Sequence, residues 1–535
     1  MVPDNHLQAA AGPAPVVRWL RGHLGARAHL RLDSRMVEPG DAFIAVAGRR
    51  TDGGAFIPAA LERGAAALVV DPQIAARTPA ARPPAVPVLA VQGLRAALGS
   101  IAAEYYDQPT ARIHTVGITG TNGKTSTCLW LAQVLESTGQ RCATLGTLGF
   151  GFPGALRDGG SSLTTPDAIS VQRLAREACE QGAQALAMEV SSIGLDQGRV
   201  DGVAFETALF TNLTRDHLDY HVDMADYAAA KGRLFDWPGL RHAVINLDDA
   251  FGRELVARIT RRPAGQRPSI TGIRVAPSGA IEASTDSAVD AATDIALRAE
   301  GVEHRPQGLR FRLVCAGAGA VQAAIVDTGL FGVYNVANLL GVIGAALACG
   351  VALPRAAAAA AALRAPPGRL QRVTSAAGDA DDEPLAIVDY AHTPDAIAKS
   401  LEALRPLAQA RQGCLWIVFG AGGDRDRGKR PVMAAAAAAA ADRIVLTSDN
   451  PRSENPESIL DELAAGLPAG TRYERHVDRA EAIAAALRGA ANTDVVLMAG
   501  KGHEDYQEIA GQRLPFSDVA VAQSVLRARA GRPAC

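Results

Sequence analysis

Short runs of apolar residues alternate with helical segments along the chain, and most of these runs end in polar residues. The predicted strands are residues 42–46, 66–70, 113–118, 184–188, 209–211, 243–246, 385–388, 414–419, 443–446 and 495–498. The predicted helices between them include residues 54–63, 127–137, 431–441 and 479–488. Strands that alternate with helices are typical of mostly parallel sheets with helices on their faces. We therefore predict an α/β protein.

Breaks in this pattern divide the chain into three predicted domains. Residues 1–110 are a small α/β domain that begins with a disordered tail at 1–15, residues 111–365 contain a mostly parallel sheet, and residues 366–535 are a Rossmann-like doubly wound domain. A Pro-Pro-Gly-Arg sequence at 366–369 interrupts a helical pattern and marks the last boundary. The apolar stretch 339–353 is too short and too rich in alanine to span a bilayer, so we predict one buried helix there.

The most specific stretch is a glycine loop between a predicted strand and a predicted helix. Residues 116–126 are Val-Gly-Ile-Thr-Gly-Thr-Asn-Gly-Lys-Thr-Ser. Glycine lets backbone N–H groups converge on phosphate oxygens, and a helix N-terminus adds partial positive charge. Lys124 would reach the outer phosphates, while Thr125 or Ser126 would hold Mg²⁺. The central domain is thus predicted to be P-loop ATPase-like, although Ile118 replaces the first glycine of the strict pattern. An ordinary glycine turn is the alternative.

Composition narrows the class of protein. The net charge of -2 indicates no broad surface for nucleic acid. Seven scattered cysteines without a CxxC pair favour reduced thiols over a disulfide scaffold or a zinc site. Residues 1–30 lack the apolar core of a signal peptide. We expect a cytoplasmic protein, a monomer, with no membrane insertion.

Polar residues at other strand ends add candidate sites. Glu189 follows strand 184–188, where a Mg²⁺ ligand would sit because ligands bind at strand C-termini. Residues 212–221 contain two histidines and several acidic or amide groups, which suggest metal or substrate contacts without a zinc spacing. Asn335 and Asn338 stand one helical turn apart and would cap their helix or contact a base edge. Hydroxyls and arginines flanking strand 42–46 suit a phosphate or sugar ligand, although solvated loops would look the same.

Taken together, these motifs resemble the Mur ligases, which are ATP-dependent amide-forming enzymes of peptidoglycan synthesis. The resemblance extends from about residue 30 to about residue 520 and rests on eight motifs in order. They are Gly120-Thr-Asn-Gly-Lys-Thr125, Thr164-Thr165-Pro166, Glu189-Val-Ser-Ser192 with Gln197 and Arg199, Asp216-His-Leu-Asp219, Asp389-Tyr-Ala-His392, Gly422-Gly-Asp-Arg-Asp426, Asp449-Asn-Pro-Arg452 and Gly500-Lys-Gly-His-Glu504. The chain departs from the family at Leu163 and Ile193, and neither departure removes a group that the chemistry needs.

The resemblance implies a reaction in two steps. A substrate carboxylate attacks the γ-phosphate of ATP, and an amine then displaces phosphate from the acyl phosphate. The implied catalytic residues are Lys124, Glu189, His217 and Lys231. Magnesium would be held by Thr125 or Ser126, Glu189, His217 and a carbamate on Lys231 (N6-carboxylysine), although Lys231 read alone is a solvated helix lysine. The implied ATP-binding residues are Gly120, Thr121, Asn122, Gly123, Lys124, Thr125, Ser126, Asn335, Asn338, Arg369 and Asp389.

The resemblance also implies two further substrates. For UDP-N-acetylmuramoyl-L-alanyl-D-glutamate the implied residues are Leu32, Ser34, Arg49, Arg50, Thr51, Thr164, Thr165, Ser191, Gln197 and Arg199. The second is meso-diaminopimelate, whose distal carboxylate requires a bidentate cation and whose distal ammonium requires acceptors. Its implied residues are Arg425, Asp449, Asn450, Pro451, Arg452, Gly500 and Glu504. Within the family, Asp-Asn-Pro-Arg accompanies diaminopimelate.

Several alternatives make different predictions. The nearest is another member of the superfamily, such as a lysine-adding ligase, a folylpolyglutamate synthetase or the D-alanyl-D-alanine-adding ligase, and loops 422–426 and 449–452 argue against these. A P-loop NTPase switch without ligation predicts ATPase activity that needs no acceptor amine. A Rossmann dehydrogenase is disfavoured because Gly-Lys-Thr supplies a cation and a hydroxyl for phosphate and metal.

Overall fold

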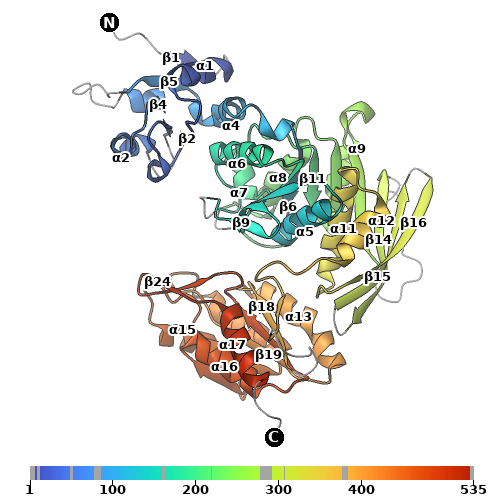
Figure 1. Ribbon diagram of the computed structural model, residues 1–535. Coiled ribbons are helices and arrows are strands. Elements are labelled where there is room, and N and C mark those ends of the chain that lie inside the picture. The colour runs from blue at the N-terminus through green and yellow to red at the C-terminus, as the bar shows by residue number, and fades with distance from the viewer. Residues whose placement is uncertain are drawn as a thin grey trace.

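Three large sheets follow one another along the chain, and the described residues also form a small two-stranded sheet (Figure 1). The computed structural model describes residues 6–8, 12–47, 52–76, 86–159, 163–218, 220–276, 292–305, 308–317, 319–375 and 383–530. Within these residues, no helix is both long and apolar enough to cross a membrane. The sequence prediction of an α/β protein with three domains is confirmed.

The first sheet has five parallel strands in the order β1-β5-β4-β3-β2. They are β1 (His6–Gln8), β2 (Leu30–Arg31), β3 (Ala42–Ala45), β4 (Ala67–Val70) and β5 (Val88–Gln92). The helices are α1 (Ala14–His23), α2 (Ile57–Glu62), α3 (Pro72–Ala75) and α4 (Leu94–Tyr105). Apolar side chains are buried on both faces of the sheet, which explains why its strands are continuous apolar runs. The predicted disordered tail is wrong for residues 6–8, which pair with β5, and for Ala14, which begins α1.

The central sheet has eleven strands in the order β16-β15-β14-β13-β12-β11-β6-β10-β7-β8-β9. From β14 to β7 the neighbours are parallel, and the strands at both edges are antiparallel. The strands are β6 (His114–Thr119), β7 (Cys142–Gly146), β8 (Gly149–Phe152), β9 (Ala155–Arg157), β10 (Ala185–Glu189), β11 (Thr207–Phe210), β12 (His242–Asn246), β13 (Ser269–Val275), β14 (Ile295–Arg305), β15 (Gly308–Gly317) and β16 (Ala320–Thr328). The last four lie in or beside the stretch 260–325, which is hard to interpret because burial does not follow residue type there: Thr271 is buried in β13, whereas Val321 and Ile325 are exposed in β16.

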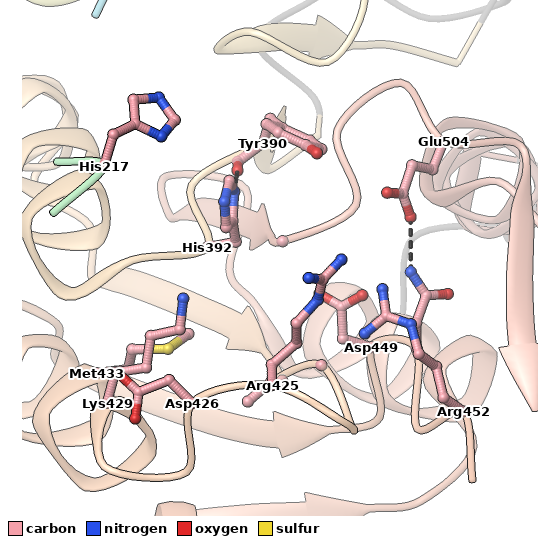
Figure 2. Close-up of a pocket in the computed structure, with 15 residues that line it drawn as sticks. His217, Tyr390, His392, Arg425, Asp426, Lys429, Met433, Asp449, Arg452 and Glu504 are labelled. Atoms are coloured by element: carbon pink, nitrogen blue, oxygen red, sulfur yellow. Dashed lines mark hydrogen bonds between the residues drawn. The ribbon is translucent and has the colours of Figure 1, made fainter. Parts of the chain in front are cut away.

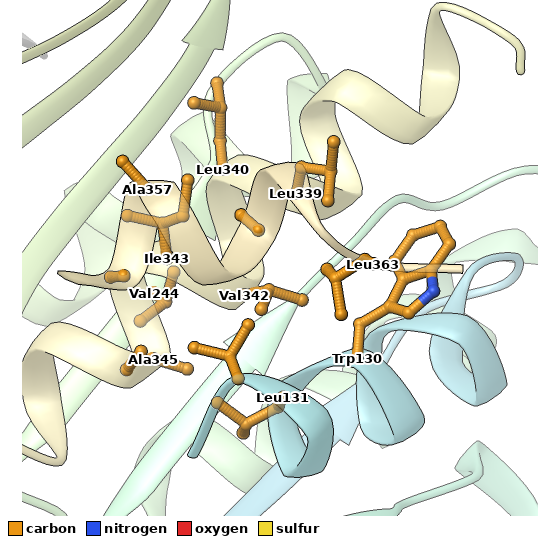
Figure 3. Packing of buried hydrophobic residues seen from close by; sticks show 14 of the residues in the cluster. Trp130, Leu131, Val244, Leu339, Leu340, Val342, Ile343, Ala345, Ala357 and Leu363 are labelled. Carbon is orange, nitrogen blue, oxygen red and sulfur yellow. The ribbon is translucent and has the colours of Figure 1, made fainter. Parts of the chain in front are cut away.

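Helices cover both faces of the central sheet. They are α5 (Lys124–Ser137), α6 (Ala168–Glu180), α7 (Ser192–Asp196), α8 (Met224–Gly232), α9 (Ala250–Thr260), α11 (Tyr334–Ala348) and α12 (Leu353–Ala361). On one face, Trp130 and Leu131 of α5 pack with Leu339 and Val342 of α11 (Figure 3). The single helix predicted at 339–353 is wrong, because α11 ends at Ala348. Gly350 then adopts φ +84°, a left-handed conformation that terminates helices, before α12 begins.

The third sheet has six strands in the order β17-β18-β22-β19-β20-β21, and only β17 is antiparallel to its neighbour. The strands are β17 (Gln371–Val373), β18 (Leu385–Asp389), β19 (Leu415–Phe419), β20 (Arg443–Thr447), β21 (Tyr473–His476) and β22 (Val495–Ala499). The helices are α13 (Pro394–Ala410), α14 (Lys429–Ala440), α15 (Pro456–Ala464), α16 (Arg479–Gly489) and α17 (Asp518–Ala530). Separate apolar clusters on its two faces make this unit doubly wound, as predicted. A hairpin of β23 (Tyr506–Ile509) and β24 (Gln512–Pro515) follows β22.

Candidate active site

The predicted phosphate loop connects β6 to α5 and is tightly enclosed. Gly120 and Gly123 have φ values of +148° and +85°, which L side chains rarely adopt. A methyl group on Gly120 would lie 1.9 Å from the Thr211 hydroxyl oxygen, and one on Gly123 would lie 2.6 Å from Asn338 Oδ1. Both backbone conformation and close approach therefore require glycine here.

Lys124 and Thr125 begin α5 and face inward. The Lys124 ammonium donates to the carbonyl oxygens of Gly120 and Thr121, each at 2.9 Å, and burial lowers its pKa. The Thr125 hydroxyl donates to Glu189 Oε2 at 3.0 Å. The other oxygen of Glu189 accepts the backbone N–H of Thr147 at 2.8 Å. A loop hydroxyl and a strand-end carboxylate thus meet at the carboxyl edge of the sheet.

Lys231 is buried, contrary to the solvated helix lysine that its sequence context alone suggests. It is 1% exposed on α8 and donates to the carbonyl oxygen of Gly120 at 2.7 Å. Its ammonium lies 4.3 Å from the centroid of the Tyr227 ring, and the His217 ring lies 6.0 Å from the same ring. Burial, together with the nearby charge of Lys124, lowers the pKa of Lys231 well below its ordinary value. Both lysines contact the carbonyl of Gly120, so the uncharged amine of Lys231 is favoured.

The residues predicted to hold magnesium do not form a complete ligand set on their own. Among the residues that the structure describes, no group of three or more His, Cys, Asp and Glu side chains is placed to hold a metal ion. Thr125 and Glu189 do offer the oxygen donors that Mg²⁺ prefers. The donor chemistry fits Mg²⁺ if phosphate oxygens and a carbamate on Lys231 supply further ligands. Ser126 is buried beside Thr125 on the same turn of α5.

The residues assigned to the adenine and ribose fall into two pairs. Asn338 donates to Asn335 Oδ1 at 3.0 Å, and Asn335 donates to the carbonyl oxygen of Phe331 at 2.7 Å. In the third domain, the Arg369 guanidinium stacks 4.7 Å from the Tyr390 ring centroid. Asp389 is buried at the end of β18 and accepts from the backbone N–H of Leu370 at 2.7 Å, while burial raises its pKa.

A chain of hydrogen bonds gathers five residues assigned to the UDP-muramoyl dipeptide. The Thr165 hydroxyl donates to the carbonyl oxygen of Glu189 at 2.9 Å and accepts the backbone N–H of Ser191 at 2.9 Å. Arg199 donates to the carbonyl oxygen of Thr165 at 2.9 Å and to Gln197 Oε1 at 2.6 Å. Thr164 accepts from the Thr147 hydroxyl at 3.2 Å. This row of polar groups therefore leads to Glu189.

The remaining residues assigned to this substrate belong to the N-terminal domain. Ser34 is buried beside β2, and Leu32 is half-buried. Arg49, Arg50 and Thr51 lie outside the described residues, as does Asp219 of the Asp-His-Leu-Asp motif.

A cavity of about 380 Å³ lies at the carboxyl ends of β18, β19, β20 and β22 and extends to His217 (Figure 2). Its lining residues are His217, Tyr390, His392, Gly420, Ala421, Gly422, Arg425, Asp426, Lys429, Met433, Asp449, Asn450, Arg452, Gly500 and Glu504. Of the residues assigned to diaminopimelate, Pro451 alone is outside this lining. The structure therefore brings together residues assigned to diaminopimelate that are up to 79 residues apart in the sequence, from Arg425 to Glu504.

Acidic and basic groups share one end of this cavity. Figure 2 shows the guanidinium groups of Arg425 and Arg452 beside Asp449, with Glu504 nearby. Lys501 is fully buried behind them and donates to Glu504 Oε2 at 2.9 Å, and Asn450 donates to the same oxygen at 2.9 Å. Burial would raise the pKa of Glu504, but these two donors lower it below its ordinary value. Glu504 is therefore an anion. Its Oε1 atom takes part in neither of these two hydrogen bonds.

Lys429 and Lys501 are site residues that the sequence interpretation did not single out. Lys429 lines the cavity because α14 begins at Lys429, two residues before the predicted helix. A compositional signal does point to both, since the chain has only five lysines among 54 basic residues. Four of these five, namely Lys124, Lys231, Lys429 and Lys501, lie in or directly behind the site, whereas Lys399 is half-exposed on α13 and pairs with Asp395. Where arginine predominates so strongly, a lysine marks a need for a compact charge or a reactive amine.

Three family models match the chain. They are described as Mur ligase family, catalytic domain, at residues 28–106, Mur ligase middle domain at residues 118–346, and Mur ligase, glutamate ligase domain, at residues 368–502. Each of the three main sheets coincides with one of these matches.

Curated relatives and solved structures agree with these matches. The UDP-N-acetylmuramoyl-L-alanyl-D-glutamate–2,6-diaminopimelate ligase of Acidovorax sp. (strain JS42) is 45% identical over 98% of this chain and 99% of its own length. The ligase of the same name from Pseudomonas aeruginosa is 46% identical over 93% of this chain and 95% of its own length. A solved structure of a ligase of that name is 35% identical, covers 94% of this chain and 95% of its own, and has a TM-score of 0.63. At 20% identity, MurF from Acinetobacter baumannii shares the fold with a TM-score of 0.61 over 91% of this chain and 95% of its own. The chain therefore belongs to the Mur ligase family.

Proposed function

We propose that the protein joins meso-2,6-diaminopimelate to the D-glutamate carboxylate of UDP-N-acetylmuramoyl-L-alanyl-D-glutamate, with conversion of ATP to ADP and phosphate. Membership of the Mur ligase family makes ATP-dependent amide ligation in peptidoglycan synthesis the reaction class. Relatives that are named for this reaction share 45–46% of their residues with nearly the whole chain. The observation that supports the choice of amino acid is the cavity in which Arg425 and Arg452 converge with Asp449 and Glu504.

In this proposal ATP binds along the glycine loop. Backbone N–H groups of residues 123–126 at the start of α5 would face the phosphates, and the half-buried Lys124 ammonium would contact the outer ones. The N–H groups of Thr121 and Asn122 instead bond Asn212 and hold the loop in shape. Asn335 and Asn338, with Arg369 and Asp389, would contact the adenine and ribose. Thr125 or Ser126, Glu189, His217 and a carbamate on Lys231 would hold Mg²⁺, which when bound neutralises phosphate charge during transfer.

Residues of the chain would position the substrates for both steps of the reaction. The row from Arg199 through Thr165 to Glu189 would guide the D-glutamate carboxylate toward the loop. One oxygen of that carboxylate attacks the γ-phosphorus, the bond from phosphorus to ADP breaks, and an acyl phosphate forms. The diaminopimelate amine next attacks the acyl carbon, loses a proton and displaces phosphate. His217 lines the amino-acid cavity from the central domain, which supports the proposal that the two steps take place in one space.

Recognition of diaminopimelate follows from the charges in the cavity. The distal carboxylate would pair with Arg425 and Arg452, because a guanidinium matches a carboxylate in two parallel hydrogen bonds. The distal ammonium would bind Glu504, Asp449 and the carbonyl oxygen of Gly500. Asn450 and Pro451 would fix the loop that carries Asp449 and Arg452, since Asn450 Oδ1 accepts from Lys501 at 3.0 Å. L-Lysine lacks the distal carboxylate and would leave both arginines without this bidentate partner.

The decisive experiment is an assay of phosphate release from ATP with the UDP-muramoyl dipeptide. We expect release to depend on meso-diaminopimelate and to be weak with L-lysine. A preference for L-lysine would contradict the assigned amino acid, and release that needs no amine would indicate an NTPase instead.

Because ATP and a nucleotide-linked sugar are the expected substrates, we also propose that the protein acts in the cytoplasm, as a monomer without a nucleic-acid partner.

Substitution of Gly123 by alanine should raise the KM for ATP about tenfold or more. Its φ of +85° costs a non-glycine residue about 1–2 kcal/mol, and the new methyl group would press against Asn338 Oδ1 at 2.6 Å. Gly139→Ala is the matched control, because Gly139 follows the same helix with φ +88° and its methyl group would meet nothing within 4 Å. Initial-rate kinetics should show an unchanged ATP KM in the control. Equal ATP KM values in both variants would contradict this placement of the loop.

A further inference from the structure

The two arginines of the amino-acid cavity lie on different loops. Arg425 belongs to the loop after β19, and Arg452 belongs to the loop after β20. A bidentate contact with one carboxylate depends on the separation of these loops. Side chains that do not line the cavity, centred on Arg430 and Glu454, hold the loops together.

Arg430 lies in the first turn of α14, and its side chain is only 1% exposed. Its two terminal nitrogens donate to the two oxygens of Glu454, at 2.8 Å and 3.0 Å. They also donate to Glu462 of α15 at 2.8 Å and to the carbonyl oxygen of Gly422 at 3.2 Å. Pairing with Arg430 lowers the pKa of Glu454 to about 2. The pair is therefore ionised, buried on the arginine side and bidentate, which is the strong form of this interaction.

Glu454 connects the two loops directly. Its Oε1 atom accepts the backbone N–H of Asp424 at 2.6 Å, so one carboxylate oxygen bonds both Arg430 and the Arg425 loop. In return, the Asp424 carboxylate accepts from the Ser453 hydroxyl at 2.6 Å and from the Ser453 backbone N–H at 3.2 Å. Each loop thus supplies a carboxylate that bonds the backbone of the other.

The backbones of the two loops are also in close contact. Gly423 donates to the carbonyl oxygen of Asn450 at 2.9 Å, and a methyl group on Gly423 would lie 1.9 Å from the carbonyl oxygen of Pro451. Arg452 donates in turn to the carbonyl oxygen of Gly423 at 2.6 Å. The direction of the Arg452 guanidinium therefore depends on where the other loop lies.

We propose that Arg430 and Glu454 are positioning residues that set the separation of Arg425 and Arg452, and thereby select an amino acid with a distal carboxylate. This inference rests on the proposed function, because it concerns the same amino-acid site. A bidentate contact tolerates little displacement, so a small opening of the loops costs much of its benefit. L-Lysine uses neither arginine for a distal carboxylate, so its weak reaction does not depend on the separation.

The variants Arg430→Lys and Glu454→Gln test this inference. Lysine keeps the charge of Arg430 but lacks the planar fork that makes two parallel bonds to Glu454, and glutamine keeps the shape of Glu454 but loses its charge. We expect the KM for meso-diaminopimelate to rise about tenfold in each, equivalent to about 1.4 kcal/mol. The KM values for ATP and the UDP-muramoyl dipeptide should stay within about twofold, and kcat/KM for L-lysine should change as little. The double variant should show much less than the product of the two single effects, because the two residues form one unit.

Two further variants keep the test independent of folding. Ser453→Ala removes one hydrogen bond between the loops at an exposed position, and we expect a rise of about threefold in the KM for meso-diaminopimelate. Arg475→Lys is the matched control, since Arg475 pairs with Asp461 and Glu457 at α15 and contacts neither loop. Its KM values should all be unchanged. KM does not depend on the active fraction of a preparation, so partial unfolding of a variant leaves the comparison intact.

The possible outcomes separate this inference from the proposed function. Unchanged KM for meso-diaminopimelate in Glu454→Gln and Ser453→Ala overturns the positioning role. A parallel rise in all three KM values also overturns it, because a general loss of structure affects every substrate. A wild-type preference for L-lysine, by contrast, overturns the proposed function whatever the variants show.

Discussion

Alanine in place of Lys231 should lower kcat by about a hundredfold to a thousandfold, the usual cost of losing one charged group that stabilises the transition state. Lys231 is 1% exposed and shares the Gly120 carbonyl with Lys124. Burial disfavours the charged form of Lys231, and repulsion from the Lys124 ammonium at the same carbonyl adds to this effect, so the pKa of Lys231 is lowered. The uncharged amine is the form that adds carbon dioxide. The resulting carbamate would be an anion beside Lys124 and an oxygen donor suited to Mg²⁺.

Phosphate-release kinetics, together with a direct probe of the carbamate, check this prediction. Formate or acetate should partly restore the kcat of Lys231→Ala by supplying a carboxylate. Carbon-13 NMR with labelled bicarbonate should show a carbamate signal in the wild type that is absent from Lys231→Ala. Lys399→Ala is the matched control, since Lys399 is a half-exposed helix lysine paired with Asp395 at 2.8 Å, and it should retain full activity and the signal. Full activity of Lys231→Ala would contradict the assignment.

Much of the fold is predictable from the sequence because its parallel strands are buried on both faces. Strands such as β18 and β19 lie within one residue of the predicted apolar runs, since no exposed face interrupts them. Strands β14 to β16 are less predictable, because exposed polar residues such as Glu303 and His304 interrupt β14, while apolar Val321 and Ile325 are exposed in β16. Helix starts are also missed. The first turns of α5 and α14 carry polar site residues, Lys124 and Lys429, where an apolar pattern gives no signal.

The sequence predicts which strand-end loops form the candidate site. It predicts far fewer of the side-chain contacts within the site. Polar residues after β18, β19, β20 and β22 meet because parallel strands end at one edge of the sheet. The burial of Lys231 depends on packing between α8 and the glycine loop, which no local pattern reports. The Arg430–Glu454 pair likewise joins residues on two loops, and either residue alone looks like an ordinary surface charge.

Alanine in place of Arg452 should raise the KM for meso-diaminopimelate about a hundredfold, equivalent to about 2.7 kcal/mol, and leave the KM for ATP within about twofold. Arg452 lines the cavity and is 24% exposed, so much of its charge is shielded from water. Its backbone is fixed by β23, because its N–H donates to the carbonyl oxygen of Glu508 at 2.9 Å and its carbonyl oxygen accepts from Ala510 at 2.7 Å. The guanidinium donates to the carbonyl oxygen of Gly423 at 2.6 Å and lies 3.5 Å from a carboxylate oxygen of Glu508, so it is held in place before the substrate arrives. Its loss leaves the distal carboxylate without its bidentate partner.

Backbone strain at Arg452 does not account for the expected effect of the alanine substitution. Arg452 has φ +50°, and alanine bears the same strain there as arginine, whereas Arg452→Gly would relieve it. If recognition depends on the guanidinium, the alanine and glycine variants should have equally high KM values for meso-diaminopimelate, and Arg452→Lys should be intermediate. Arg513→Ala is the matched control, because Arg513 stacks on Tyr506 at 4.5 Å on the same hairpin and does not line the cavity. Initial rates with each substrate varied in turn provide the measurement. Equal increases in the KM values for ATP and meso-diaminopimelate would show that Arg452 supports the fold of the domain, and the carboxylate would then have to be recognised by another residue.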